Sequence, residues 1–336
     1  MKAAPFMSYR AGITYNLKKS NVPDTGDAEA EFDEEDTIRA IQDALETAGY
    51  TVDLFEAEED LPVRLLKNRP DFVFNIAEGR EGRGREAQVP AILSFLRIPF
   101  TGSDETTLCV AMDKALTKRL VSSHGICTPD YEFVKYGSSF SGTSLSFPVI
   151  VKPNNEGSSK GVTSHSVVSD AAALRLLLDE KFKTYRQDML IEEYISGREF
   201  TIGILGNGDD LRIFPPMEII FTDKAHSIYS YEVKRDFRRY VRYKCPACIG
   251  EDIVKEIEKA AEKIYHSLEC RDLARMDFRL REDGQLYFIE INPLPGLAPE
   301  YSDFPMIVSF CGMDYKTLIR SIADKALARY GLKNHQ

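Results

Sequence analysis

The sequence has no apolar run long enough to cross a bilayer, which takes about 18 consecutive apolar residues. Its first residues, MKAAPFMSYRAG, also lack the long apolar segment of a signal peptide. Basic residues are in deficit, because 43 lysines and arginines face 53 aspartates and glutamates, for a formal net charge of -10. A nucleic-acid-binding protein normally shows a basic face. We therefore expect a cytoplasmic protein with neither a membrane nor a nucleic acid as its partner.

Cysteine is scarce, and six cysteines in 336 residues do not make a secreted disulfide framework. Cys245 and Cys248 form one CxxC pair, but a zinc ribbon needs a second pair and the sequence has none. Reduced thiols are the simpler interpretation, although a metal or redox role for this pair stays open. Internal repeats and low-complexity segments are also absent.

The first hundred residues alternate between helical and strand-like segments. Acidic residues open a predicted helix at 33–48, and Gly49 marks its end. Residues 51–55 and 71–75 are predicted as buried strands with a short helix between them, and a second helix is predicted at about 86–96. This alternation predicts an α/β unit with a parallel sheet.

The rest of the chain combines short strands with longer helices, and its length predicts two or three domains in all. The clearest helix is 251–269, since its isoleucines, alanines and leucine share one stripe. Residues 274–281 and 285–291 flank the turn EDG and predict a hairpin. The other predicted helices are 113–124, 169–180 and 314–330, and the other predicted strands are 131–134, 147–152, 162–168, 189–194 and 199–205.

Three oxygen-bearing side chains fall on the predicted hairpin. Glu290 and Asn292 are two residues apart and share a face of their strand, and Asp277 lies on the neighbouring strand. Magnesium prefers such hard oxygen ligands. A solvated sheet face is the alternative, although Asp and Asn are poor strand formers.

A glycine- and serine-rich loop follows a predicted strand in FPVIVKPNNEGSSKGV, residues 147–162. Backbone N–H groups and hydroxyls of such a loop can hold a phosphate, and Lys152 and Lys160 would add positive charge. The GxxxxGK[ST] order of a Walker A motif is missing. An ordinary hairpin loop is the alternative.

Two further segments carry candidate binding groups. MLIEEYISGREF brings a pair of acids to the end of a strand, where they could accept hydrogen bonds from a nucleoside or cap a turn. Lys114 opens a predicted helix, and a helix N-terminus with a lysine favours phosphate, although a lone lysine is usually just solvated.

In this order the motifs resemble the ATP-grasp enzymes and, within them, the D-alanine–D-alanine ligase family. The resemblance covers about residues 70–330, and the motifs are specific as a set. It implies an α/β (α+β) fold in which an N-terminal parallel domain precedes two antiparallel-sheet domains that enclose ATP. The implied domain limits are 1–103, 104–191 and 192–336. The matching stretches are IPFTGSD and MDKALTK within 98–118, VKPNNEGSSKGV, IEEYISGREFTIGILG, LARMDFRL and FIEINPLPG.

The resemblance also implies the site residues. Asp277, Glu290 and Asn292 would hold two magnesium ions, for which manganese could substitute. ATP contacts are implied for Lys114, Lys152, Ser159, Glu192, Glu193, Ile195, Glu199 and Lys234. Catalytic roles are implied for Ser158, Lys234, Arg275, which would steady the tetrahedral intermediate, and Gly296, whose N–H would face the oxyanion.

The implied reaction joins a carboxylic acid to an amine. ATP phosphorylates the acid, the amine attacks the acyl phosphate, and an amide forms with release of ADP and phosphate. Because an acyl phosphate must be kept from water, a closing lid is expected. The basic loop at 222–244 is the candidate lid, which weakens any nucleic-acid interpretation of its charge. A homodimer is also implied.

The chain departs from the family in its expected substrate contacts. The first substrate's ammonium is usually held by an N-terminal glutamate that has no clear match here, and Glu31, Glu34 or Glu35 are the candidates to replace it. Glu78 stands where histidine is usual, and Arg83 and Arg85 add charge nearby. In the lid, Arg235 replaces a tyrosine. Tyr301 and Ser302 replace a Ser-Leu pair that grips the second substrate, although an alignment slip of one residue would restore the serine.

These departures lie in substrate contacts, while the nucleotide and metal residues are kept. They indicate the same reaction on other substrates, which would be amino acids or small peptides. A D-alanine–D-alanine ligase of cell-wall biosynthesis is the alternative, and a non-catalytic nucleotide-binding module is the third hypothesis.

Overall fold

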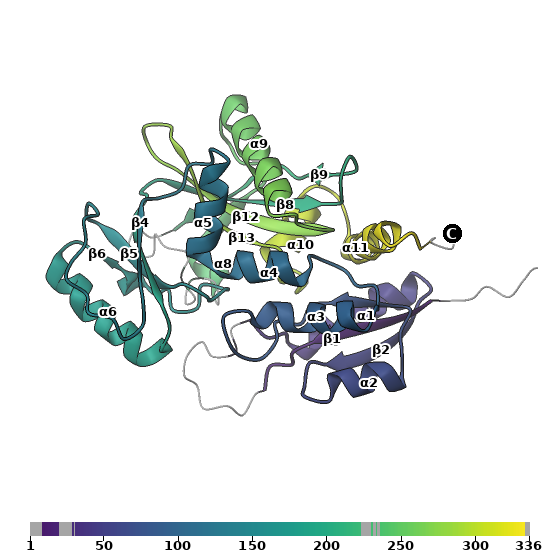
Figure 1. Ribbon diagram of the computed structural model, residues 1–336. Coiled ribbons are helices and arrows are strands. Elements are labelled where there is room, and N and C mark those ends of the chain that lie inside the picture. The colour runs from purple at the N-terminus through teal and green to yellow at the C-terminus, as the bar shows by residue number, and fades with distance from the viewer. Residues whose placement is uncertain are drawn as a thin grey trace, which may run out of the picture.

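The protein contains three β-sheets, which Figure 1 shows as three units around a common centre. The structure is a computed structural model that describes residues 9–19, 29, 31–222, 230, 233 and 236–332. In Figure 1 the N-terminal sheet lies at the bottom, a unit with α6 at the left, and the largest sheet with α9 at the top. The mixed α/β prediction, with one parallel and two antiparallel sheets, is confirmed.

The N-terminal sheet is parallel and has the strand order β2-β1-β3. The sequence did not predict its central strand, because Gly12 interrupts the apolar pattern; a Cβ there would lie 3.0 Å from the Phe55 ring. The prediction that 51–55 is buried is wrong, since β2 is an edge strand and most of it is partly or fully exposed. The elements are β1 (Arg10–Tyr15), α1 (Glu35–Thr47), β2 (Thr51–Glu56), α2 (Leu61–Lys67), β3 (Phe72–Asn75) and α3 (Gln88–Phe95).

The second sheet is antiparallel, with the order β4-β7-β5-β6. Its buried valines pack against Leu174 and Leu178 of α6. The strand predicted at 162–168 shrinks to two residues, because Thr163 and Ser166 form a capping box that closes a 3-10 turn. The elements of this unit are β4 (Tyr131–Val134), β5 (Val149–Pro153), β6 (Val167–Val168), α6 (Ala171–Tyr185) and β7 (Met189–Glu193). The helices that precede it, α4 (Glu105–Met112) and α5 (Lys114–Ser123), pack in the core of the third sheet.

The third sheet is antiparallel with the order β11-β10-β8-β12-β13, and β9 pairs with β8. Ile257, Ala261 and Ile264 of α9 bury their apolar stripe against it, as the sequence predicted. The elements are β8 (Arg198–Leu205), β9 (Arg212–Ile213), β10 (Met217–Phe221), α8 (Phe237–Tyr240), β11 (Val241–Lys244), α9 (Glu251–Ser267), β12 (Leu273–Leu280) and β13 (Leu286–Asn292).

The C-terminal helices α10 (Asp303–Phe310) and α11 (Tyr315–Arg329) join the N-terminal sheet to the third sheet. One hydrophobic core contains Ile13 of β1, Ile41 of α1, Phe304 of α10 and Ile322 of α11. The sequence predicted α11 but neither α4 nor α10. The domain limits given above stay a prediction. In the part of the chain that the structure describes, none of the helices has the length and apolar character required to cross a bilayer.

Candidate active site

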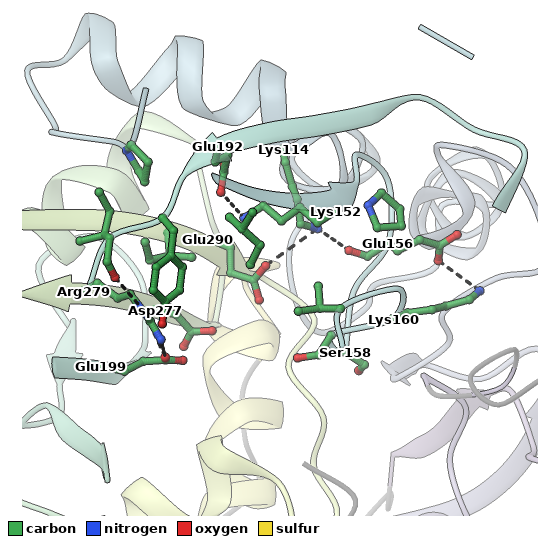
Figure 2. Close-up of a pocket in the computed structure, with 18 of the residues that line it drawn as sticks. Lys114, Lys152, Glu156, Ser158, Lys160, Glu192, Glu199, Asp277, Arg279 and Glu290 are labelled. Atoms are coloured by element: carbon green, nitrogen blue, oxygen red, sulfur yellow. Dashed lines mark hydrogen bonds and ion pairs between the residues drawn. The ribbon is translucent and has the colours of Figure 1, made fainter. Parts of the chain in front are cut away.

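A cleft between the two antiparallel sheets gathers most of the predicted nucleotide and metal residues (Figure 2). The second sheet contributes Lys152 and the glycine-rich loop, and the third contributes Asp277 and Glu290. Lys234 and Arg235 lie outside the described residues, as does much of the predicted lid. The predicted residues that line the cleft are Lys114, Lys152, Ser158, Ser159, Glu192, Glu193, Ile195, Glu199, Arg275, Asp277 and Glu290.

Glu192 joins two lysines at the floor of the cleft. Its carboxylate is buried and lies 2.6 Å from Lys152 Nζ and 2.9 Å from Lys118 Nζ. Burial alone would raise the pKa of Glu192, but the two ammonium groups hold it below its ordinary value. Burial lowers the pKa of Lys118 to about 8. The sequence analysis missed Lys118, although its i,i+4 spacing from Lys114 was a usable signal.

Lys114 stands at the first turn of α5, where the glycine-rich loop meets the helix. Asp113 caps α5 by accepting a hydrogen bond from Leu116 N at 3.0 Å, and Asn154 donates to the same carboxylate at 2.9 Å. The Lys114 ammonium donates to the Glu156 carbonyl and lies 3.9 Å from Glu290 Oε2. Lys114 therefore bridges the loop and the predicted metal ligands.

The glycine-rich loop is held in an uncommon backbone conformation. Ser158 and Ser159 have φ angles of 48° and 58°, in the left-handed region. This conformation costs a non-glycine residue about 1–3 kcal/mol. Gly157 N donates to Glu31 Oε1 at 2.7 Å, so a residue of the N-terminal part anchors the loop. The loop is therefore preorganised around the cleft into which its serines face.

Asp277 lies on the strand next to that of Glu290, as the sequence predicted, and a bulge between Asp277 and Phe278 makes the two pair directly. Asp277 Oδ1 is buried and has no hydrogen-bond partner among the described residues. Burial raises the pKa of Asp277 to about 6, and Arg275, 2.8 Å away, opposes this rise. Two carboxylates and the Asn292 amide, with one carboxylate oxygen unpartnered, are a donor set that fits magnesium.

Two arginines hold the far end of the cleft: Arg279 in β12 and Arg281 just after that strand. Arg279 donates from Nε to Glu199 Oε2 at 3.1 Å and from Nη1 to the Ile195 carbonyl at 2.8 Å. Arg281 pairs with Glu193 at 2.7 Å. These contacts fix the acidic junction that the sequence indicated as a nucleoside contact.

Arg85 forms the wall between the N-terminal sheet and the glycine-rich loop. Its guanidinium lies 2.6 Å from Glu31, 3.1 Å from Glu156 and 2.8 Å from the Asn155 carbonyl, and both Arg85 and Glu31 are buried. Of the three acids predicted for the first substrate's ammonium, only Glu31 lies here.

Three other predicted charges of this region face solvent. Glu34 pairs with Lys18 and Glu35 with Arg39 on the exposed side of α1. The Arg83 side chain is 75% exposed and pairs with Asp113.

Two more carboxyl groups lie behind this wall. Burial, with Glu86 and Glu31 nearby, raises the pKa of Glu78 well above its ordinary value. Burial and Glu31 raise the pKa of Glu86 to about 8. The sequence analysis did not single out Glu86.

Glu86→Gln should make the protein more stable at high pH. In the wild type, the folded state keeps the Glu86 proton up to about pH 8, whereas the unfolded state loses it near 4.5, so stability falls as pH rises through this window. The variant lacks this loss and should gain about 4 kcal/mol more at pH 9 than at pH 5. Urea unfolding at the two pH values measures the difference. The exposed Glu81→Gln is the control, and an equal gain at both pH values would contradict the assignment.

The segment PEYSDFP contacts three parts of the site. Ser302 Oγ accepts a hydrogen bond from Ala298 N at 3.1 Å and lies 2.8 Å from where a Cβ on Gly296 would stand. The Tyr301 ring packs on Phe237 of α8 with 5.9 Å between ring centroids. Asp303, which the sequence analysis missed, lies 3.2 Å from Arg275 Nη1.

Comparisons with known proteins agree with this geometry. Residues 120–324 match the family model described as "D-ala D-ala ligase C-terminus". A D-alanine–D-alanine ligase of Aquifex aeolicus (strain VF5) is 37% identical over 290 residues, which cover 85% of this chain and 93% of that protein. The crystal structure of D-alanine–D-alanine ligase from Bacillus anthracis complexed with ATP has a TM-score of 0.76 at 22% identity and covers 96% of this chain and 99% of that one.

The fold is therefore that of an ATP-grasp enzyme, with a cleft between two antiparallel sheets. The chain belongs to the D-alanine–D-alanine ligase family, as the sequence predicted. Within this family it is an ATP-dependent carboxylate–amine ligase.

Proposed function

We propose that this chain phosphorylates the carboxylate of an amino acid or small peptide with ATP and joins it to the amine of a second one. A single observation supports the residue assignments: the lysines, loop serines and carboxylates that the sequence assigned to ATP and metal line one cleft. Lys114 and Lys152 would hold the ATP phosphates, and the loop at Ser158 and Ser159 would wrap the γ-phosphate.

Asp277, Glu290 and Asn292 would hold magnesium, which when bound neutralises charge on the phosphates. Glu199 would contact the ribose, and Glu192 and Ile195 would border the adenine. Arg275 and the Gly296 N–H would face the carbonyl oxygen that becomes negative when the amine attacks. Manganese in place of magnesium, the closing role of 222–244 and a homodimer stay predictions.

The residues around Arg85, where the acid substrate would bind, favour substrates other than D-alanine. Glu31 is already paired with Arg85, Glu78 occupies the place of the usual histidine, and Asp303 adds a carboxylate beside Arg275. We therefore propose a ligase of different amino acids or small peptides. The second candidate is a D-alanine–D-alanine ligase, which the names of its relatives favour.

Hydroxylamine trapping separates these candidates, because it captures an acyl phosphate without needing the correct amine. The full chain, ATP and magnesium would be given each D- and L-amino acid in turn, and the hydroxamate and released phosphate measured. Accepted acids would then be paired with amines and the products weighed by mass spectrometry. Selective activation of D-alanine with D-alanyl-D-alanine as product would support the second candidate, and another acid the first. ATP binding without phosphate release for any acid would contradict both.

A further inference from the structure

Arg275 stands between the predicted metal ligands and the segment PEYSDFP. Its Nη2 lies 2.8 Å from Asp277 Oδ2 and 3.8 Å from Glu290 Oε1, while its Nη1 lies 3.2 Å from Asp303 Oδ2. The arginine and Asp303 are both buried, at 7% and 3% exposure. One buried guanidinium is therefore shared by three carboxylates.

This sharing bears on the metal site. A guanidinium and a divalent cation compete for the same carboxylate oxygens, and in a buried site that competition is strong. Asp303 accepts a hydrogen bond from Nη1 of the guanidinium, and Asp277 Oδ2 accepts one from Nη2. The other oxygen of Asp277, Oδ1, has no hydrogen-bond partner among the described residues. Without Asp303, one attraction that opposes the pull of Asp277 and Glu290 on the guanidinium would be lost.

We propose that Asp303 is a positioning residue for Arg275, and that its carboxylate restrains the guanidinium so that Asp277 and Glu290 stay available to the metal. This inference rests on the proposed metal site. Asp303 begins α10, and the same segment carries Ser302 beside Gly296. The segment would thereby link the place of the attacking amine to the place of the metal through one arginine.

The test measures Mn²⁺ affinity without turnover, by electron paramagnetic resonance of the full chain with the non-hydrolysable analogue β,γ-imido-ATP. Asp303→Leu should raise the Mn²⁺ Kd at least about tenfold and Asp303→Asn at least about threefold, while Asp303→Glu should lie nearer the wild type. Asp314→Leu, which removes the exposed capping carboxylate of α11, should leave the Kd unchanged. If Asp303→Leu does not fold, the nearly isosteric Asp303→Asn decides.

A double-variant cycle separates positioning from a direct effect of charge. In an Arg275→Met background, Asp303→Asn should change the Mn²⁺ Kd no further, because the residue through which it acts is gone. A threefold change that persists there, or a folded Asp303→Asn within twofold of the wild type, would overturn the inference. If the wild type with β,γ-imido-ATP binds no Mn²⁺ beyond that held by the free analogue, the metal assignment itself fails instead.

Discussion

Glu290→Gln should leave the fold intact and abolish turnover. The amide keeps the shape of the side chain but removes the charge that would face magnesium, so we expect phosphate release to fall at least about 100-fold. The fold should tolerate the change because the Glu290 side chain is partly exposed and its ion pairs with Lys114 and Arg275 are long, at 3.9 and 3.8 Å. Phosphate release with a saturating substrate pair measures the loss, and thermal unfolding checks the fold.

The matched control is Glu282→Gln, an exposed acid in the turn of the same hairpin. It should behave as the wild type in both measurements. Turnover of Glu290→Gln within a few-fold of the wild type would remove Glu290 from the metal site.

Lys152→Met should damage both stability and catalysis, and two further substitutions should separate the two effects. Removing one ammonium group leaves the buried Glu192 with Lys118 alone, and breaking a buried ion pair typically costs about 3–5 kcal/mol. Because Lys152 would also hold ATP phosphate, we expect turnover to fall about 100-fold and the KM for ATP to rise.

Adding both Glu192→Gln and Lys118→Met to Lys152→Met should recover part of the stability, since no buried charge of this group is then left unpaired, but none of the turnover. Urea unfolding and phosphate release measure the two quantities. If this triple variant regained turnover together with stability, Lys152 would be only a structural partner of Glu192.

The sequence predicted best what local pattern determines. Strand alternation and the EDG turn were sufficient to place Asp277 on the strand next to Glu290. The direct pairing of the two depends on a bulge between Asp277 and Phe278, which the sequence did not predict. The strand that ends at Lys152 was equally clear from its apolar run. The family resemblance added the roles of these residues, which pattern alone left open.

What the sequence did not predict depends on contacts between distant segments. The pairing of Arg85 with Glu31 spans 54 residues and that of Arg275 with Asp303 spans 28, and no local periodicity encodes either. Strand β1 was missed because Gly12 leaves a gap in its apolar pattern. A glycine stands there because the Phe55 ring packs closely against the backbone at this position. The buried acids Glu78 and Glu86 likewise depend on neighbours that only the tertiary fold supplies.

The double attachment of Glu31 has a thermodynamic consequence. One of its oxygens accepts a hydrogen bond from Gly157 N of the glycine-rich loop, while the carboxylate also accepts hydrogen bonds from Arg85. An acid substrate that displaces Arg85 from Glu31 would thus alter the anchor of the glycine-rich loop. In the same way, ATP that reshapes this loop would alter the contact between Glu31 and Arg85. By linkage the two effects are equal: whatever factor the acid imposes on ATP affinity, ATP imposes on the affinity for the acid. In the proposed arrangement, Glu31 would make the two substrates each other's effectors.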